Sequence, residues 1–434
     1  MNKEIAHFAL ETALKNGAQG ARISYGESIE GTICTLNGEI ENIRNASSRS
    51  ISLSIFADGR FASFSTNRIT KDELERFIPE CVASCRLLEA DPYRTLPDPS
   101  LYYIGNSKEL DTEDSAFDEI SFEQKLSKLR ENFEEIPSDS RIISVTNDYD
   151  ENKRYDYIID SQGLQAEETH TFYTIANECT VKGEGDIRPQ NGWAEGGTYF
   201  DKLASGSGLK GYQRSIGMLG ARKIGSGKYN IVFENSVAAK AVSAIIGALS
   251  GASIKEKNSF LLDSLGKRIF PEFLNIADNP HIPQASGATF FDGEGVATKY
   301  LDIIKDGYVN TYFLNTYYAN RLNMPRTVNA PNTIVFPTGS DLSLEQILGK
   351  TGKGILITGF NGGNSNPVTG DFSYGIEGYY FENGTKLYPI KEMNITGNFI
   401  SLWAKNIFIG NDPIKFYKWQ IPSLAFADID ISGL

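Results

Sequence analysis

Residue types that bind metals or activate water are sparse in this sequence. It has three histidines and four cysteines, and the histidines, His7, His170 and His281, lie far apart. A zinc site usually needs three or four nitrogen, sulfur or oxygen ligands. Cys81 and Cys85 are one helical turn apart, but they lie on the apolar side of a predicted helix, where thiols pack as small hydrophobic groups. The residues therefore predict no metal site in this chain.

Motifs for nucleophilic catalysis and phosphate binding are incomplete. No serine stands in a Gly-x-Ser-x-Gly elbow. Residues 206–211 read Gly-x-Gly-x-x-Gly, but no buried β-run precedes them and no helix is expected directly after them, so we interpret them as a glycine-rich loop. Gly349-Lys350-Thr351 resembles the end of a phosphate loop, yet Leu344 stands where the first glycine is needed. We therefore expect no nucleotide site.

The densest group of small and polar residues is the segment 359–373. Gly, Asn and Asp tolerate positive φ and present backbone donors, so such a segment lines a pocket or turns a corner. Its length exceeds that of ordinary connections, which favours a function. Asp371 would either fix the turn by accepting hydrogen bonds or face the pocket. The candidate substrate-cavity residues are Asn364, Asn366, Thr369, Gly370, Asp371 and Ser373.

Composition narrows the class of protein. The chain has 434 residues, of which 40% are hydrophobic and 22% charged, typical of a globular protein of two or three domains. Its net charge of −13 disfavours nucleic acid as a partner. The longest uncharged apolar stretch, 241–254, is shorter than the roughly 20 residues that span a bilayer, so no membrane partner is expected. The few cysteines and the absence of a signal-peptide pattern predict a cytoplasmic protein.

The elements of the first half follow from hydrophobic spacing and turn residues. Apolar residues at helical spacing predict helices over 2–16, 71–90 and 122–135. An Asn-Gly pair at 37–38 and an Asp-Gly pair at 58–59 favour type I′ hairpin turns between β-rich runs. Further strands are predicted over 141–146, 155–159 and 171–181.

The second half is predicted to be rich in strands. Glycine is dense between residues 183 and 227, which indicates a seam, so we divide the chain into an N-terminal α+β domain, 1–222, and a C-terminal β-rich domain, 223–434. A strand at 229–233 and a helix at 236–249 follow, with hairpin turns at 306–307 and 383–384. Strands outnumber helices without strict alternation. This pattern predicts an α+β fold of mixed or antiparallel sheets with flanking helices.

Four segments in a fixed order resemble landmarks of the TldD/PmbA family. They are Ser259-Phe260-Leu261, Phe291-Asp292-Gly293-Glu294-Gly295, Asn366 to Ser373, and Ile395 to Phe399; in the first half, Asn16-Gly17-Ala18, Ile40-Glu41 and Phe56 to Arg60 fit as well. The resemblance covers nearly the whole chain. It implies a bacterial or archaeal two-domain protein that works in a pair. Catalytic TldD and its companion TldE, also called PmbA, form a zinc-type metallopeptidase that trims unfolded peptides. An older name of the family is modulator of DNA gyrase.

The sequence departs from the catalytic branch of the family at the helix that opens the second half. In that branch the helix carries His-Glu-x-x-x-His, in which two imidazoles hold the metal and the Glu activates water. A cysteine near the C-terminus completes the ligands. Here Val242, Ser243 and Gly247 stand at the three motif positions, and no cysteine follows Cys179. The chain therefore resembles the PmbA/TldE branch, which implies no cofactor in this chain and zinc only in a TldD-like partner.

The leading interpretation is a non-catalytic subunit that shapes the substrate cavity beside a TldD-like catalytic subunit and helps to hold an unfolded peptide. The aromatic segments 308–318, predicted as a hairpin, and 379–381 are expected to contribute to a subunit interface. A homodimer is possible when the chain is alone. Two alternatives stay open: a self-sufficient homodimeric metallopeptidase with an atypical site, and a non-proteolytic regulator of the DNA gyrase modulator type.

Overall fold

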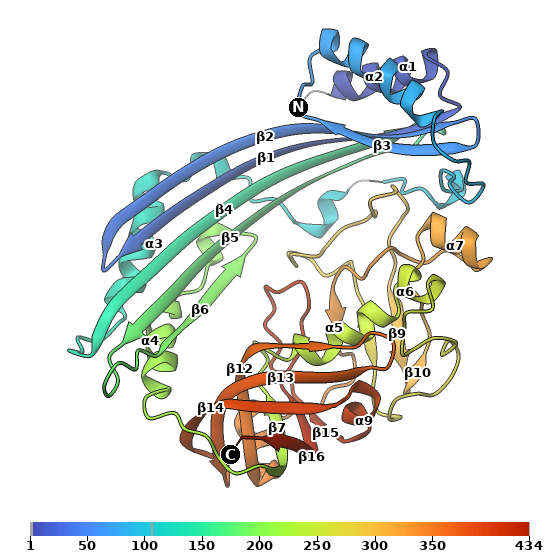
Figure 1. Cartoon of the computed structure of the whole chain (residues 1–434). Helices are drawn as coiled ribbons and strands as arrows, with labels where there is room; N and C mark the ends of the chain where they lie inside the picture. Colours follow the sequence, from blue (N-terminus) through green and yellow to red (C-terminus); the bar gives the residue numbers. More distant parts are fainter. Residues whose placement is uncertain (1–2, 106, 434) are drawn as a thin grey trace.

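The computed structural model describes residues 3–105 and 107–433. Figure 1 shows a long curved sheet, formed by the first half, arching over a second half built on two further sheets. The strands of the long sheet are all antiparallel, in the order β3-β2-β1-β4-β5-β6. They are β1 Gly20–Leu36, β2 Glu39–Ala57, β3 Arg60–Thr66, β4 Ile142–Asp160, β5 Gln165–Val181 and β6 Gln190–Gly197.

Four helices cover one face of the long sheet. α1 (Lys3–Lys15) and α2 (Lys71–Cys85) pack near one end of the strands, and α3 (Phe122–Glu134) and α4 (Ser207–Gly217) near the other. Since successive side chains of a strand point to opposite faces, the alternate residues of each strand point away from these helices. The second half lies on that other side (Figure 1). No helix in the described part of the chain is long and apolar enough to cross a bilayer.

The predicted hairpin turns are confirmed by backbone geometry. φ is 53° and 86° at residues 37 and 38, and 53° and 70° at residues 58 and 59, so both central residues have the positive values that a type I′ turn requires. Residues 306–307 and 383–384 show the same pair of positive φ angles between β9 and β10 and between β13 and β14. These local signals set the register of the four hairpins.

The second half contains a four-stranded sheet, β10-β9-β8-β11, and a six-stranded sheet, β14-β13-β12-β7-β16-β15. β14 also pairs with β16, so five strands of the larger sheet close into a small barrel. Only β7 and β12 pair in parallel among the strands described. The strands are β7 Gly227–Phe233, β8 Ile276–Asp278, β9 Leu301–Lys305, β10 Tyr308–Val309, β11 Ile334–Val335, β12 Lys353–Ser365, β13 Asp371–Glu382, β14 Thr385–Asn398, β15 Asn406–Ile409 and β16 Leu424–Ser432. The helices are α5 Ala239–Ala248, α6 Gly251–Lys255, α7 Thr316–Leu322, α8 Leu344–Thr351 and α9 Phe399–Ala404.

The predicted α+β class is confirmed, but two element boundaries are wrong. The predicted helix over 71–90 ends at Cys85. The strands predicted at 141–146 and 155–159 are one strand, β4. Its polar middle is continuous because Glu151 is buried and accepts hydrogen bonds from Lys125 of α3 and from the Tyr149 hydroxyl. A buried ion pair thus continues the strand where the hydrophobic pattern stops.

The glycine-dense stretch 183–227 is more than a seam. It contains β6, the edge strand of the long sheet, and α4, which packs on that sheet. Because α4 begins directly after Gly206, the prediction that no helix follows this glycine motif is wrong. The glycines permit close packing: a Cβ on Gly208 would lie 1.8 Å from the Asn132 carbonyl oxygen. The amide of Gly208 donates to the Asn132 side chain, which occupies the helix N-terminus that a phosphate would need. The domain division after residue 222 stays a prediction.

Candidate functional site

The segment predicted as a long polar loop is mostly a β-hairpin. β12 continues to Ser365 and β13 begins at Asp371, which leaves residues 366–370 as the connection. The register shifts twice along the hairpin, and a Cβ on Gly363 (φ 97°) would lie 2.2 Å from the Ser373 carbonyl oxygen. The prediction of a long loop is wrong because β-bulges at these glycines interrupt the alternation that identifies a strand.

The six candidate residues lie at the end of this hairpin. All are exposed except Gly370, which is buried. Asp371 accepts a hydrogen bond from the Thr369 hydroxyl at 2.7 Å and another from the Asn398 amide at 3.0 Å. These two bonds hold the pKa of the Asp371 carboxyl below its ordinary value. This geometry supports the interpretation in which Asp371 fixes the turn.

Three of the four landmark segments meet at this hairpin in an aromatic cluster formed by Phe260, Phe372 and Phe399. The Phe399 ring centroid lies 4.7 Å from that of Phe372 and 6.0 Å from that of Phe260. The Phe260 amide donates to the Pro367 carbonyl at 2.8 Å, and the Phe399 amide donates to the Gly370 carbonyl at 2.9 Å. Because the two backbone hydrogen bonds join the three segments and their rings pack together, the cluster fixes the shape of the hairpin end.

Helix α5 carries the three residues that the resemblance aligns with the metal motif of the catalytic branch. Val242 is fully buried in the core of the second half, whereas Ser243 and Gly247 are exposed. The Ser243 hydroxyl donates back to the Lys240 carbonyl at 3.4 Å, and a Cβ on Gly247 would meet no atom within 4 Å. An aliphatic side chain, a hydroxyl and a bare backbone do not supply two imidazoles and a carboxylate. The residues at this position therefore do not fit a zinc ion.

The histidines and helical cysteines offer no substitute. In the described part of the chain no three or more His, Cys, Asp or Glu side chains are grouped to hold a metal. Cys81 and Cys85 are buried, and burial raises the pKa of the Cys81 thiol to about 11, as expected for packing residues. The histidine partners are Tyr157 for His7, Glu168 for His170 and Thr298 for His281.

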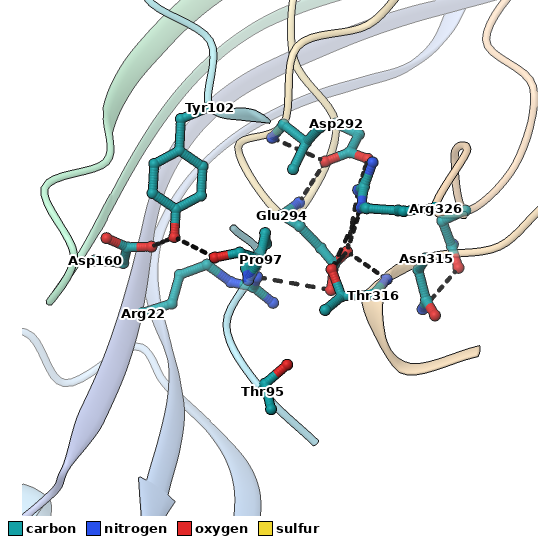
Figure 2. A network of polar contacts seen from close by, with 12 residues as sticks. Arg22, Thr95, Pro97, Tyr102, Asp160, Asp292, Glu294, Asn315, Thr316 and Arg326 are labelled. Atoms are coloured by element: carbon teal, nitrogen blue, oxygen red, sulfur yellow. Dashed lines mark hydrogen bonds and ion pairs between the residues drawn. The ribbon is translucent and has the colours of Figure 1, made fainter. Parts of the chain in front are cut away.

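The fourth landmark, residues 291–295, belongs to a different hydrophobic cluster from the other three, and Figure 2 shows Asp292 and Glu294 beside residues of the first half. Arg326 donates to Asp292, and it donates to Glu294 Oε2 from Nη2 at 3.0 Å and from Nε at 3.2 Å. Thr316 donates to the same Glu294 oxygen from its amide at 3.0 Å and its hydroxyl at 2.7 Å. Burial alone would raise the pKa of Glu294, but the Thr316 bonds and the charges of Arg326 and Arg22 outweigh burial and lower it.

Arg22 brings the long sheet into this junction network, which we define as Arg22, Asp292, Glu294, Thr316 and Arg326. It extends from β1, and its Nη1 lies 3.8 Å from Glu294 Oε1. Its side chain is 14% exposed and that of Arg326 only 8%, so the charges are well shielded from water. Figure 2 shows the Arg22 side chain directed at Glu294 beside the Tyr102–Asp160 hydrogen bond. The network therefore ties the first half to the second through charged groups.

Two cavities flank the junction network. The larger, of about 570 Å³, lies between the helix-free face of the long sheet and the second half, and small residues such as Gly287, Ala288 and Gly293 line one wall. The smaller, of about 260 Å³, lies beside Asp292 and Glu294 and is lined by Arg22 and Arg94 together with aromatic rings. None of the six hairpin candidates lines either cavity. Sequence reasoning missed Arg22, Arg94 and Arg326 because single arginines far apart in sequence form no motif.

Comparisons with known proteins agree with the landmarks. Models of the PmbA/TldA metallopeptidases match the chain twice, domain 1 over residues 12–84 and the C-terminal domain over residues 226–433. Metalloprotease PmbA of Escherichia coli O157:H7 is 28% identical over 99% of this chain and 97% of its own length.

Solved structures extend the likeness to the whole fold. A Bacteroides thetaiotaomicron protein proposed as a modulator of DNA gyrase is 40% identical, covers 100% of this chain and 99% of its own, and has a TM-score of 0.97. TldE from Thermococcus kodakarensis, 18% identical over 99% of this chain and 100% of its own, has a TM-score of 0.84 and supports the fold alone. The chain described here belongs to the TldD/PmbA family of metallopeptidases.

Proposed function

We propose that this chain is a TldE/PmbA-like, non-catalytic subunit of a TldD/TldE-type metallopeptidase that acts on unfolded peptides. The observation that carries this proposal is helix α5, where Val242, Ser243 and Gly247 supply neither metal ligands nor a general base. The metal and the activated water then come from a TldD-like partner. What this chain contributes is contact: it completes the cavity and helps to orient the peptide.

The exposed end of the β12–β13 hairpin is the candidate cavity surface of this subunit. Residues 361–369 are all exposed, and β12 pairs with β7 only over residues 355–357, so the outer edge of residues 361–365 has no strand beside it in the described chain. An extended peptide is bound largely through main-chain hydrogen bonds that do not depend on its sequence. The hairpin end is therefore suited to contact either the peptide or the partner beside α5.

The segments predicted to form the interface contribute little exposed surface. Residues 308–318 are not a hairpin, since β10 ends at Val309 and α7 begins at Thr316. Phe313 is 2% exposed and Phe381 is fully buried, so both belong to the chain's own core. Tyr308, at 43% exposed, is the main exception. The hairpin prediction for 308–318 is therefore wrong, and the small exposed area of both segments favours an additional surface for the partner.

The surface that most needs a partner is residues 39–50 of β2, which are exposed throughout. β3 pairs with β2 only over residues 51–57, so the outer edge of 39–50 has no strand beside it in the described chain. Ile40 and Ile43 are 45% and 46% exposed there. Native proteins rarely leave a long edge of this kind uncovered. We assign this edge to the TldD-like partner.

Reconstitution tests the proposal. The purified chain alone should not cleave an unfolded peptide, whereas a mixture with a TldD-like protein should cleave it faster than that protein alone. Ile43→Glu should weaken association at least tenfold, while Leu87→Glu, at a site 87% exposed beside the opposite end of β2 from residues 39–50, should not. Cleavage by the chain alone, or a mixture no faster than its partner, would contradict the proposal. Equal association of both variants would move the interface elsewhere.

A further inference from the structure

The smaller cavity at the junction contains a cation with no ionic partner. The Arg94 guanidinium carbon lies 3.5 Å from the centre of the Tyr317 ring and 5.0 Å from that of Phe61, so the group is held between aromatic rings of the two halves. Among residues 3–105 and 107–433, no oxygen accepts a hydrogen bond from the Arg94 side chain and no carboxylate pairs with it. Stacking uses the faces of the guanidinium and leaves its in-plane N–H groups unused.

Arg22 adds a second incompletely used guanidinium to the same cavity. Its contact with Glu294, at 3.8 Å, is longer than a hydrogen bond. Asp292 and Glu294 also line the cavity, but both already accept hydrogen bonds: Arg326 donates to both carboxylates, and Thr316 donates to that of Glu294. Asp160 lies opposite Arg22 in the β1–β4 pairing, so Arg22 has carboxylates on two sides, and Arg94 is the guanidinium at this cavity with no ionic partner in the described residues.

The cavity walls restrict the shape of that ligand. Phe56 and Phe61 stand with ring centroids 5.0 Å apart, and with Tyr317 they form an aromatic wall beside the arginines. Asn315 and Thr95 add polar groups to the cavity lining; Figure 2 shows Asn315 on the side of Thr316 and Arg326. A volume of about 260 Å³ holds one side chain and its terminal group rather than a folded segment.

We propose that this cavity binds a carboxylate attached to an apolar or aromatic group. The carboxylate accepts hydrogen bonds from the in-plane donors of Arg94, a geometry that a guanidinium matches with two parallel bonds, while Arg22 adds charge. The apolar group packs against Phe56, Phe61 and Tyr317. Two sources share this chemistry: a free small acid, and the C-terminal carboxylate of a peptide. The peptide source rests on the proposed function, whereas the free acid does not.

Calorimetric titration of the full chain tests the site without any partner. The probes are N-acetylphenylalanine, its amide, and a hexapeptide ending in phenylalanine as the free acid and as the C-terminal amide. At least one acid should bind, and its amide should bind at least tenfold more weakly. Binding of the small acid alone identifies a free acid as the ligand, and markedly tighter binding of the peptide acid identifies a peptide terminus.

Variants separate a binding role of Arg94 from a structural one. Arg94→Gln should weaken acid binding at least tenfold without changing the weak binding of the amide. Arg321→Gln is the matched control, because Arg321 also lies near the Tyr317 ring, at 5.8 Å, but does not line the cavity. If Arg94→Gln does not fold, Arg94→Lys keeps the charge without the two-pronged donor geometry and should bind the acid more weakly than the parent.

Three results would overturn the site: no acid binds at millimolar concentration, the acid and amide bind equally, or the Arg94 and Arg321 variants bind alike. An inactive reconstituted complex would instead count against the proposed function. It would leave a positive titration in place, so the two failures are distinguishable.

Discussion

The hairpin cluster and the junction of the two halves carry family landmarks, but they treat polar groups in opposite ways. At the hairpin, Asp371, Thr369 and Asn398 satisfy one another, and the aromatic rings pack among themselves. At the junction, Arg94 has no ionic partner and Arg22 has only a long one. Mutual satisfaction fixes a backbone, whereas donors left unused beside a cavity are available to a ligand. The Asp371 and Phe399 contacts thus fix the shape of the hairpin end, whereas the junction offers unused donors to a ligand.

Removal of one side chain from each region tests this comparison most directly. Phe399→Ala removes a ring that is 1% exposed, and Arg326→Met leaves Asp292 and Glu294 without their main donor. Each change should lower the free energy of unfolding by about 3–5 kcal/mol. Urea denaturation measures both, and only Arg326→Met should also weaken acid binding at the junction cavity.

Arg268→Ala is the control for the loss of an arginine. Arg268 pairs with Glu272 at an exposed site, so its removal should leave the urea midpoint unchanged. If Phe399→Ala reduced acid binding as much as Arg326→Met does, the two regions would not be independent, and the comparison would fail.

A second unsatisfied group near the larger cavity gives a pH-dependent prediction. Asp278 is 1% exposed; one of its oxygens accepts the amides of Asn332 and Thr333, while Oδ2 is buried with no partner in the described chain. Burial raises the pKa of Asp278 from 3.8 to about 6. Because the folded pKa exceeds the unfolded one, ionisation destabilises the fold as pH rises through this range, by about 3 kcal/mol at pH 8.

Asp278→Asn should remove that penalty and keep an acceptor for both amides. The variant should be more stable than the parent at pH 8 by up to about 3 kcal/mol, and the difference should vanish near pH 4. Urea unfolding at several pH values measures it. An equal difference at pH 4 and pH 8 would show that the carboxylate is not the cause.

Asp371→Asn tests the hairpin end, where we expect a smaller change in stability. Asparagine keeps one acceptor oxygen and loses the other, so the melting temperature should fall slightly while turnover by the reconstituted complex stays at the parent value. Because hydrogen bonds lower the pKa of Asp371, its stabilising contribution is present above the ordinary pKa and is lost as pH falls through the lowered one. An unchanged melting temperature with reduced turnover would instead make Asp371 a cavity contact. If neither the melting temperature nor the turnover changes, Asp371 has neither role.

Local signals in the sequence were sufficient for much of the fold. The Asn-Gly and Asp-Gly turns, the amphipathic helices and the α+β class depend on neighbouring residues, so they could be predicted. The continuity of β4 could not, because it depends on Lys125 reaching Glu151 from another element. The bulges at Gly363 and its neighbours concealed a hairpin, and Arg22, Arg94 and Arg326 converge only through the tertiary fold. The site was therefore less predictable than the elements that carry it.

Metal content tests the central claim most directly. The purified chain and a TldD-like partner should be dialysed separately against a weak chelator and measured by elemental analysis. With Val242, Ser243 and Gly247 at the motif positions, this chain should retain far less than one zinc ion per molecule. The partner, with its His-Glu-x-x-x-His helix, should retain about one. About one zinc ion per molecule in this chain alone would contradict its assignment as the non-catalytic subunit.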